Sequence, residues 1–204
     1  MKNFIEVGKT EEEQVEQIKK WIKENGMQIV AGVLIGLSAI WGLDAYKQYQ
    51  YSQSVEARTN YLNLASSPIN SYMYDELKAS YADSGYTDQA TLIMAKYAVD
   101  NKDYAKALEH LNSLTNSKNE FVANIAKIRA ANINLEMGNH KQALSLLETT
   151  NNSFSGLYNH AKGDVYVATN EIDLAKKHYQ LALTQISKES ELQSLITIKL
   201  NDLN

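Results

Sequence analysis

The longest hydrophobic run of the chain lies near its N-terminus, from Met27 to Leu43. It contains no charged residue, and its only polar side chains are Gln28 and Ser38. A helix on the surface of a soluble core carries one polar face, which this run lacks. At ~1.5 Å per residue, a helix over the run would extend roughly 25 Å, close to a bilayer core of about 30 Å. The pattern predicts a transmembrane helix over residues 27–43.

Two further features separate this helix from a cleaved signal peptide. Trp21 and Trp41 would lie roughly 30 Å apart along a helix, as tryptophans at two membrane interfaces do. The segment before the run is long and rich in glutamate, unlike the short basic start of a signal peptide, and no small-residue cleavage site closes the run. We therefore expect the helix to remain as an anchor.

Positively charged residues are more frequent before the run than after it. Within about twenty residues of the run, the preceding ones are Lys9, Lys19, Lys20 and Lys23, and the following ones are Lys47 and Arg58. Basic residues that flank a span stay on the cytoplasmic side. The distribution predicts a single-pass protein of a bacterial inner membrane, with a cytoplasmic N-terminus and a periplasmic C-terminal domain.

The segment before the span has an amphipathic pattern. Thr10 and Glu13 have the spacing of a capping box at the start of a helix. The apolar stripe that follows consists of Val15, Ile18, Trp21 and Ile22. A helix lying on the membrane surface and a helix that binds a cytosolic partner both fit this stripe. Asn25 and Gly26 form a helix-breaking pair, so we expect a break before the span, and we expect residues 1–9 to be disordered.

Small residues recur inside the span at a spacing of four. Gly32 and Gly36 form a GxxxG motif, and Ser38 and Gly42 form a second pair of small residues. Such pairs leave a notch in which another helix backbone can approach closely. Gly32 and Gly36 are therefore candidate residues for packing against a second transmembrane helix.

From Thr87 onward, three segments share a helix-turn-helix pattern. Their characteristic residues are Ala95, Ala98, Tyr104, Ala107 and Leu111 in the first, Ala131, Gly138, His140, Ala143 and Leu147 in the second, and Gly163, Tyr166, Ile172, Ala175, Tyr179 and Ala182 in the third. The alanines Ala107, Ala143 and Ala175 lie 36 and 32 residues apart, which brackets the about 34-residue period of tetratricopeptide repeats. Small residues would let the two helices of each repeat cross closely.

The fold class predicted from these patterns is all-α, with one N-terminal transmembrane helix followed by a tetratricopeptide-repeat-like α-solenoid. The expected organisation is a cytosolic tail (1–26), the span (27–43), membrane-proximal helices (44–86), the repeats (87–187) and a C-terminal capping helix (188–204). The single proline and nine glycines in 204 residues agree with helices throughout.

Composition and motifs argue against catalysis, metal binding and nucleic-acid binding. The net charge is −4 and no basic patch is visible, so we expect no nucleic-acid partner. The chain has no cysteine, and its four histidines, His110, His140, His160 and His178, are spread over the repeats without metal-ligand spacing. No nucleophile elbow and no phosphate-binding loop is present. We expect a non-enzymatic protein without cofactor or metal.

The first helix of each tetratricopeptide repeat lines the concave face of the array. Counting back from the anchor alanines predicts a partner groove, which consists of Leu92, Lys96, Val99, Ile128, Asn132, Leu135, His160, Asp164 and Val167. Exposed apolar side chains in this arrangement mark interaction sites. Two alternatives are that the C-terminal helix fills the groove and that the register is shifted by one residue.

The layout resembles the YfgM family of ancillary SecYEG translocon subunits. The resemblance rests on the tail EEEQVEQIKKWIKENG, the span motif GVLIG, the repeat segment ATLIMAKYAVDNKDYAKAL and the closing ITIKLNDL. It implies an inner-membrane adaptor whose periplasmic domain associates with the SecYEG translocon, with the periplasmic chaperone PpiD and with newly translocated client proteins. It also implies that the cytosolic tail restrains the Rcs stress response. A scaffold of another envelope or cell-division complex with fixed partners is the alternative.

The glycine pair in the span gives a first prediction. Replacing Gly32 and Gly36 together by isoleucine should release a membrane partner, because two branched side chains hold the helix backbones apart. Co-purification from detergent-solubilised membranes measures this loss. Val30→Ile with Leu34→Ile, on the opposite face of the helix, is the control and should retain the partner. Retention of every partner by the glycine variant would contradict the packing role.

Overall fold

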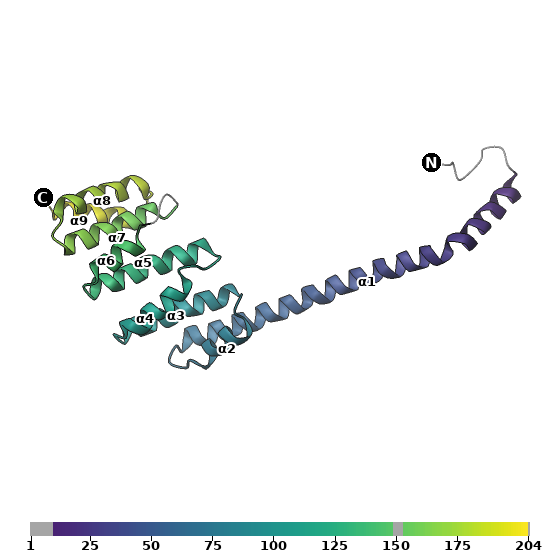
Figure 1. Ribbon diagram of the computed structural model, residues 1–204, viewed down its shortest axis with the longest axis horizontal. Coiled ribbons are helices and arrows are strands. Elements are labelled where there is room, and N and C mark those ends of the chain that lie inside the picture. The colour runs from purple at the N-terminus through teal and green to yellow at the C-terminus, as the bar shows by residue number, and fades with distance from the viewer. Residues whose placement is uncertain (1–9, 149–152, 204) are drawn as a thin grey trace. The chain divides into compact units, whose positions relative to one another are not determined.

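The computed structural model describes residues 10–148 and 153–203, and the elements found there are all α-helices. The helices are α1 (Glu11–Ser66), α2 (Tyr72–Ser80), α3 (Gly85–Asp100), α4 (Tyr104–Leu114), α5 (Glu120–Glu136), α6 (His140–Leu146), α7 (Ser155–Ala168), α8 (Ile172–Gln185) and α9 (Glu191–Asn201) (Figure 1). The predicted all-α fold class is therefore confirmed. The expectation of disorder for residues 1–9 falls outside the described residues.

The chain divides into two compact units, Met1–Val55 and Glu56–Asn204. The first unit contains most of α1. Its start agrees with the predicted capping box, since the Thr10 N–H donates to Glu13 Oε2 at 3.3 Å. Three glutamates in the first helical turn, Glu11 to Glu13, also interact favourably with the positive end of the helix dipole.

The predicted break at Asn25 and Gly26 is wrong, because α1 continues through both residues. The Asn25 side chain stays within the helix, where its Nδ2 donates to the Trp21 carbonyl at 2.9 Å. One interior glycine costs a helix only about 1 kcal/mol relative to alanine. Uninterrupted helix-forming sequence on both sides outweighs that local cost.

Within the described residues, α1 is the one helix long and apolar enough to cross a membrane. The side chains of its apolar segment are exposed, with Met27, Ile35 and Trp41 at 83%, 70% and 74%. The core helix of a soluble domain would bury such side chains. The segment therefore has the exposure expected of a helix whose apolar surface is covered by lipid.

The second unit begins inside α1, because the last turns of this helix pack against α2 and α3. Their shared core consists of Ala57, Leu64, Tyr74, Leu77, Ala90 and Met94. At its edge, the Tyr81 hydroxyl donates to Glu56 Oε2 at 2.6 Å. The helix that carries the apolar segment is thus also a packed element of the C-terminal unit.

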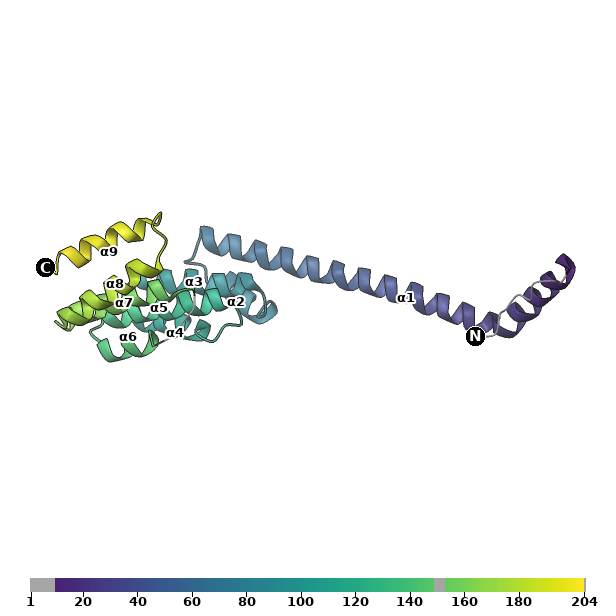
Figure 2. The same ribbon diagram turned by 90° about the horizontal axis from the view of Figure 1, so that it is seen from above.

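Three helix pairs follow, α3 with α4, α5 with α6 and α7 with α8, and each pair packs on the next (Figures 1 and 2). The predicted anchor alanines Ala107, Ala143 and Ala175 lie in the second helices and are fully buried. An alanine presents only a methyl group at each crossing, so the helices of a pair can approach closely.

The turns inside the three pairs have one geometry. Lys102, Gly138 and Asn170 occupy equivalent positions and have positive φ angles of 62°, 76° and 62°. In each turn the next N–H donates to a carbonyl five residues earlier at 2.8 Å; the pairs are Asp103 with Ala98, Asn139 with Asn134 and Glu171 with Tyr166. These bonds satisfy carbonyls that the helix end leaves unpaired. Only Gly138 marks this geometry plainly in the sequence.

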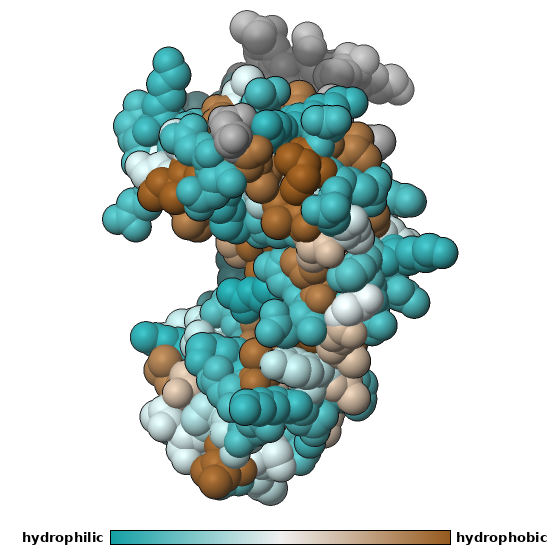
Figure 3. Space-filling view, turned by 90° about the vertical axis from the view of Figure 1, so that its left-hand side faces the viewer, coloured by the Kyte–Doolittle hydropathy of each residue, from teal (hydrophilic) through white to brown (hydrophobic). Residues whose placement is uncertain are grey.

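The helix α9 ends the stack by packing on α8. Ile196 is fully buried against Tyr179 and Ala182, and the packing extends to Leu192 and Leu200. Other apolar side chains of α9, such as Leu195 and Ile198, remain exposed. The space-filling view shows apolar side chains of this end of the stack set among polar ones (Figure 3).

The helices α7 and α8 cross closely at Gly163, and this contact predicts the effect of one substitution. A Cβ atom added to Gly163 would lie 2.3 Å from Tyr179 Cε1, and the ring is fixed by its burial. Gly163→Ala should lower the stability of the unit by about 1–3 kcal/mol, as overpacked cores do. Thermal unfolding followed by circular dichroism measures the change.

Gly85→Ala is the matched control, because a Cβ atom there meets nothing within 4 Å. This variant should melt within about 0.5 kcal/mol of the parent protein, as surface substitutions do. Equal stability of the two variants would contradict the tight α7–α8 crossing.

Candidate functional site

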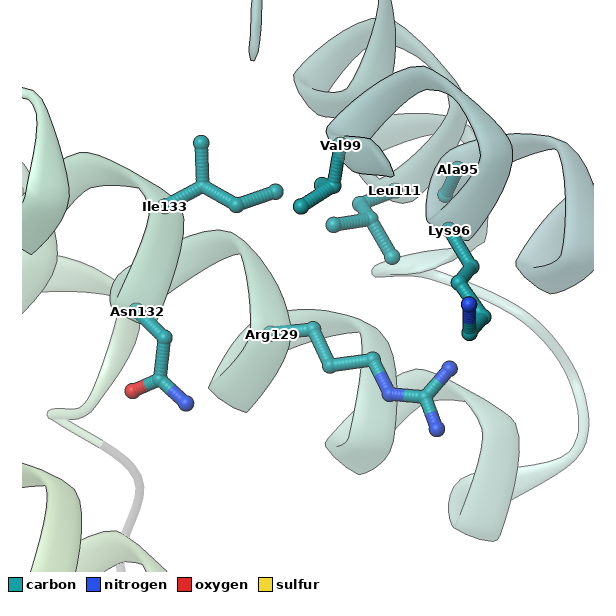
Figure 4. A pocket seen from close by; sticks show the side chains of 7 residues that line it. All are labelled: Ala95, Lys96, Val99, Leu111, Arg129, Asn132 and Ile133. Carbon is teal, nitrogen blue, oxygen red and sulfur yellow. The ribbon is translucent and has the colours of Figure 1, made fainter. Parts of the chain in front are cut away.

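A pocket of about 360 Å³ lies between α3 and α5, the first helices of two neighbouring repeats. We call it the α3–α5 pocket. Its lining consists of Ala95, Lys96, Val99, Leu111, Arg129, Asn132 and Ile133 (Figure 4). The volume is near the lower end of the range of ligand sites, about 300–1,000 Å³. It suits a few side chains of a partner.

The interior of the pocket is apolar. Ala95, Leu111 and Ile133 belong to the core between α3, α4 and α5, and Val99 packs on that core from its half-buried position. In the close-up view the side chains of Val99, Leu111 and Ile133 converge between the helices (Figure 4). An apolar side chain placed there would be removed from water on several sides, which favours binding.

The rim of the pocket is polar. The charged ends of Lys96 from α3 and Arg129 from α5 lie on one side, and Asn132 points away from them (Figure 4). Lys96 Nζ lies 2.6 Å from Asp100 Oδ2, one helical turn away. The side chains of that ion pair are 72% and 56% exposed, so the pair is open to solvent and weak.

The nine residues of the predicted groove have three different environments. Lys96, Val99 and Asn132 line the α3–α5 pocket. Leu92, Ile128 and Leu135 are half-buried and pack on the cores of the repeats. His160 and Asp164 contact α9, and Val167 is exposed. The assignment of all nine to one partner surface therefore stays a prediction.

In the third repeat, α9 reaches the predicted groove through Lys199. Its Nζ lies 2.7 Å and 2.9 Å from the two carboxylate oxygens of Asp164, and 3.0 Å from His160 Nε2. The Tyr179 hydroxyl of α8 donates to Asp164 Oδ1 at 2.6 Å. Asp164 thus joins three helices, and α9 contacts these two residues of the predicted groove but does not line the α3–α5 pocket.

Burial lowers the pKa of His160, and the nearby Lys199 ammonium lowers it further against the opposing effect of Asp164. A neutral His160 can accept a hydrogen bond from the lysine at Nε2. Because the folded pKa lies below the unfolded value of about 6.5, the unfolded chain binds the proton more tightly. This contribution to stability is present above that pH and is lost as the pH falls toward the folded pKa.

Four residues of the pocket were missed by counting along the repeats, namely Ala95, Leu111, Arg129 and Ile133. On α5 the prediction takes Ile128, Asn132 and Leu135. The pocket shares only Asn132 with this set and also uses Arg129 and Ile133. One feature of the sequence could have singled out Arg129 as a site residue. It is a positively charged residue of a rare type in this chain, which has no arginine other than Arg58 and Arg129.

Elsewhere, the described residues contain no group of three or more side chains that could hold a metal ion. His110 is buried against Tyr74, whose hydroxyl lies 3.2 Å from its Nδ1. Burial also lowers the pKa of His110. In α1, a Cβ atom at Gly32 or Gly36 would meet nothing within 4 Å, and the packing role of these two glycines stays a prediction.

Comparison with known proteins identifies relatives over nearly the whole chain. The family described as a tetratricopeptide repeat-like domain matches residues 19–204. The ancillary SecYEG translocon subunit of Haemophilus influenzae is 30% identical over 95% of this chain and 97% of its own length. The corresponding protein of Aggregatibacter actinomycetemcomitans is 27% identical over the same shares. That of Escherichia coli is 21% identical over 98% and 100%. No solved structure matches the chain significantly.

The contact between α9 and the third repeat gives a prediction for Lys199. Lys199→Met should raise the pKa of His160, because the ammonium that lowers it is removed while Asp164 remains. A pH titration of the His160 ring by NMR measures the shift. Lys188→Met, which changes an exposed lysine before α9, should leave the pKa unchanged. An unchanged value in Lys199→Met would mean that α9 does not dock on α7.

Proposed function

Because the chain belongs to the tetratricopeptide repeat-like family of the ancillary SecYEG translocon subunits, we propose that it is a non-enzymatic accessory protein of the translocon. The observation that carries the proposal is the match to the Haemophilus influenzae subunit over 95% of this chain. That match includes both the apolar segment of α1 and the repeats. A relative that shared only the repeats would support a general scaffold equally well.

The proposal places α1 across the inner membrane as a single span. Its support is the exposed apolar segment of α1 and the names of the relatives. We propose further that the N-terminus is cytoplasmic and that the unit from Glu56 onward is periplasmic. The lysines before the span support this orientation.

In this arrangement the α3–α5 pocket is the surface for partners on the far side of the membrane. Its apolar interior supports contact with side chains of chains that emerge unfolded from a translocon, since such chains expose apolar residues. We extend the proposal to hand-over of these clients to a periplasmic chaperone such as PpiD. A regulatory role of the cytosolic tail in the Rcs response rests on the family resemblance alone.

Site-specific photo-crosslinking in intact cells tests the function. A photo-reactive amino acid at Asn132, which is exposed at the pocket, should crosslink to translocon subunits and to newly translocated chains. Blocking translocation should remove the crosslinks to the translocated chains within the time of one export cycle. Mass spectrometry of the purified adducts identifies the partners.

The same amino acid at Lys141, exposed on the second helix α6, is the control and should give far fewer of these adducts. Crosslinks at Asn132 to one fixed envelope protein, unaffected by blocking translocation, would favour the alternative function as a structural scaffold. Absence of every translocon adduct from both positions would contradict the proposed function.

A further inference from the structure

We infer that the α3–α5 pocket selects partner segments in which an aspartate or glutamate lies beside a leucine-sized apolar side chain. The inference rests on the proposed function and names the chemistry of the segment that the pocket takes. It follows from two properties of the same small site, an apolar interior and a rim with two cations from facing helices.

The interior requires an apolar group. Ala95, Leu111 and Ile133 are buried core residues that still border the pocket, and Val99 completes its wall. A polar side chain inserted here would lose water without gaining hydrogen bonds from these four residues. An apolar side chain would instead gain contacts with each of them. The interior thus favours an apolar side chain over a polar one. Its four residues are uncharged, so they cannot favour a negative group over a positive one.

The rim requires an anion. The Arg129 guanidinium has no hydrogen-bond or ion-pair partner in the part of the chain that the structure describes, so its fork of donors is available. Lys96 lies on the same side of the pocket, and its solvent-exposed contact with Asp100 can be shared with an incoming group (Figure 4). Arginine binds a carboxylate through two parallel hydrogen bonds, which a neutral amide cannot match.

The size and charge of the site limit the anion to a single carboxylate. Two cations at one rim of a pocket of about 360 Å³, in a chain of net charge −4, do not form the extended positive surface that a nucleic acid needs. We assign the carboxylate to a side chain rather than to a chain end. The pocket is formed by α3, α4 and α5 and opens to solvent, so a partner chain can continue beyond it in both directions.

Because interior and rim belong to one pocket, the two side chains must lie on the same face of the segment. Positions i and i+2 satisfy this in an extended chain, and positions i and i+3 or i+4 satisfy it in a helix. An end-blocked synthetic peptide with one leucine and one glutamate at such a spacing, in a background of alanine and glutamine, carries the required chemistry.

Binding of this fluorescent peptide to the full-length protein in lipid nanodiscs tests the inference, with empty nanodiscs as the blank. Replacing the glutamate of the peptide by glutamine should weaken binding about three- to fivefold, the size expected for one exposed charged contact. Added salt should reduce the difference between the two peptides. A third peptide, with the leucine replaced by alanine, should also bind more weakly.

Arg129→Gln should remove the preference for glutamate over glutamine while leaving the contribution of the leucine. Lys141→Gln, which removes one exposed positive charge on α6, should retain the full preference. Arg129→Glu should favour a peptide with lysine in place of glutamate. Equal binding of the glutamate and glutamine peptides by the parent protein would overturn the inference.

Two other outcomes separate the inference from the proposed function. If a peptide with a free terminal carboxylate and no glutamate binds more tightly than the glutamate peptide, the assignment to a side chain is overturned. If the charge preference fails while crosslinks from Asn132 to translocated chains persist, the selection is wrong and the proposed function stands. If the preference holds but no translocon adducts form, the proposed function is wrong and the site binds other partners.

Discussion

The close crossing of two helices in each repeat is the contact on which the second unit depends. It requires a small residue where the backbones meet, as at the fully buried Ala107, Ala143 and Ala175. In the third repeat the requirement is strictest, because the ring of Tyr179 fills the space above Gly163. With the pairs held this way, the left-handed turns at Lys102, Gly138 and Asn170 can repeat one backbone geometry. Each pair then leaves one surface to be covered by the next.

The pocket between α3 and α5 is a consequence of the same packing. Second helices fill the space behind the first helices, while neighbouring first helices meet only in part, and Ala95 is too small to close the gap. Core side chains such as Leu111 and Ile133 therefore border an opening to solvent. In the third repeat, Lys199 of α9 binds Asp164 beside His160.

The apolar segment of α1 is stabilised by a different environment from the repeats. Its side chains are exposed within the chain itself, and they require lipid or another transmembrane helix as a partner. The last turns of the same helix bury Ala57 and Leu64 against α2 and α3. Residues of α1 therefore belong to both units, the apolar segment to the first and Ala57 and Leu64 to the second.

Patterns within single segments were sufficient to predict the apolar span, the all-α class and the anchor alanines, because helix periodicity and repeat spacing are local properties of the sequence. The predicted break at Asn25 and Gly26 was wrong because the stability of a long helix depends on its whole length. Only the tertiary structure decided that Arg129 and Ile133, rather than Ile128 and Leu135, border the pocket. It also decided that Lys199 reaches Asp164 from a helix 35 residues away in sequence. Spacing indicates which side chains share a face of one helix, whereas the rotation of neighbouring helices against each other determines which flank faces a gap.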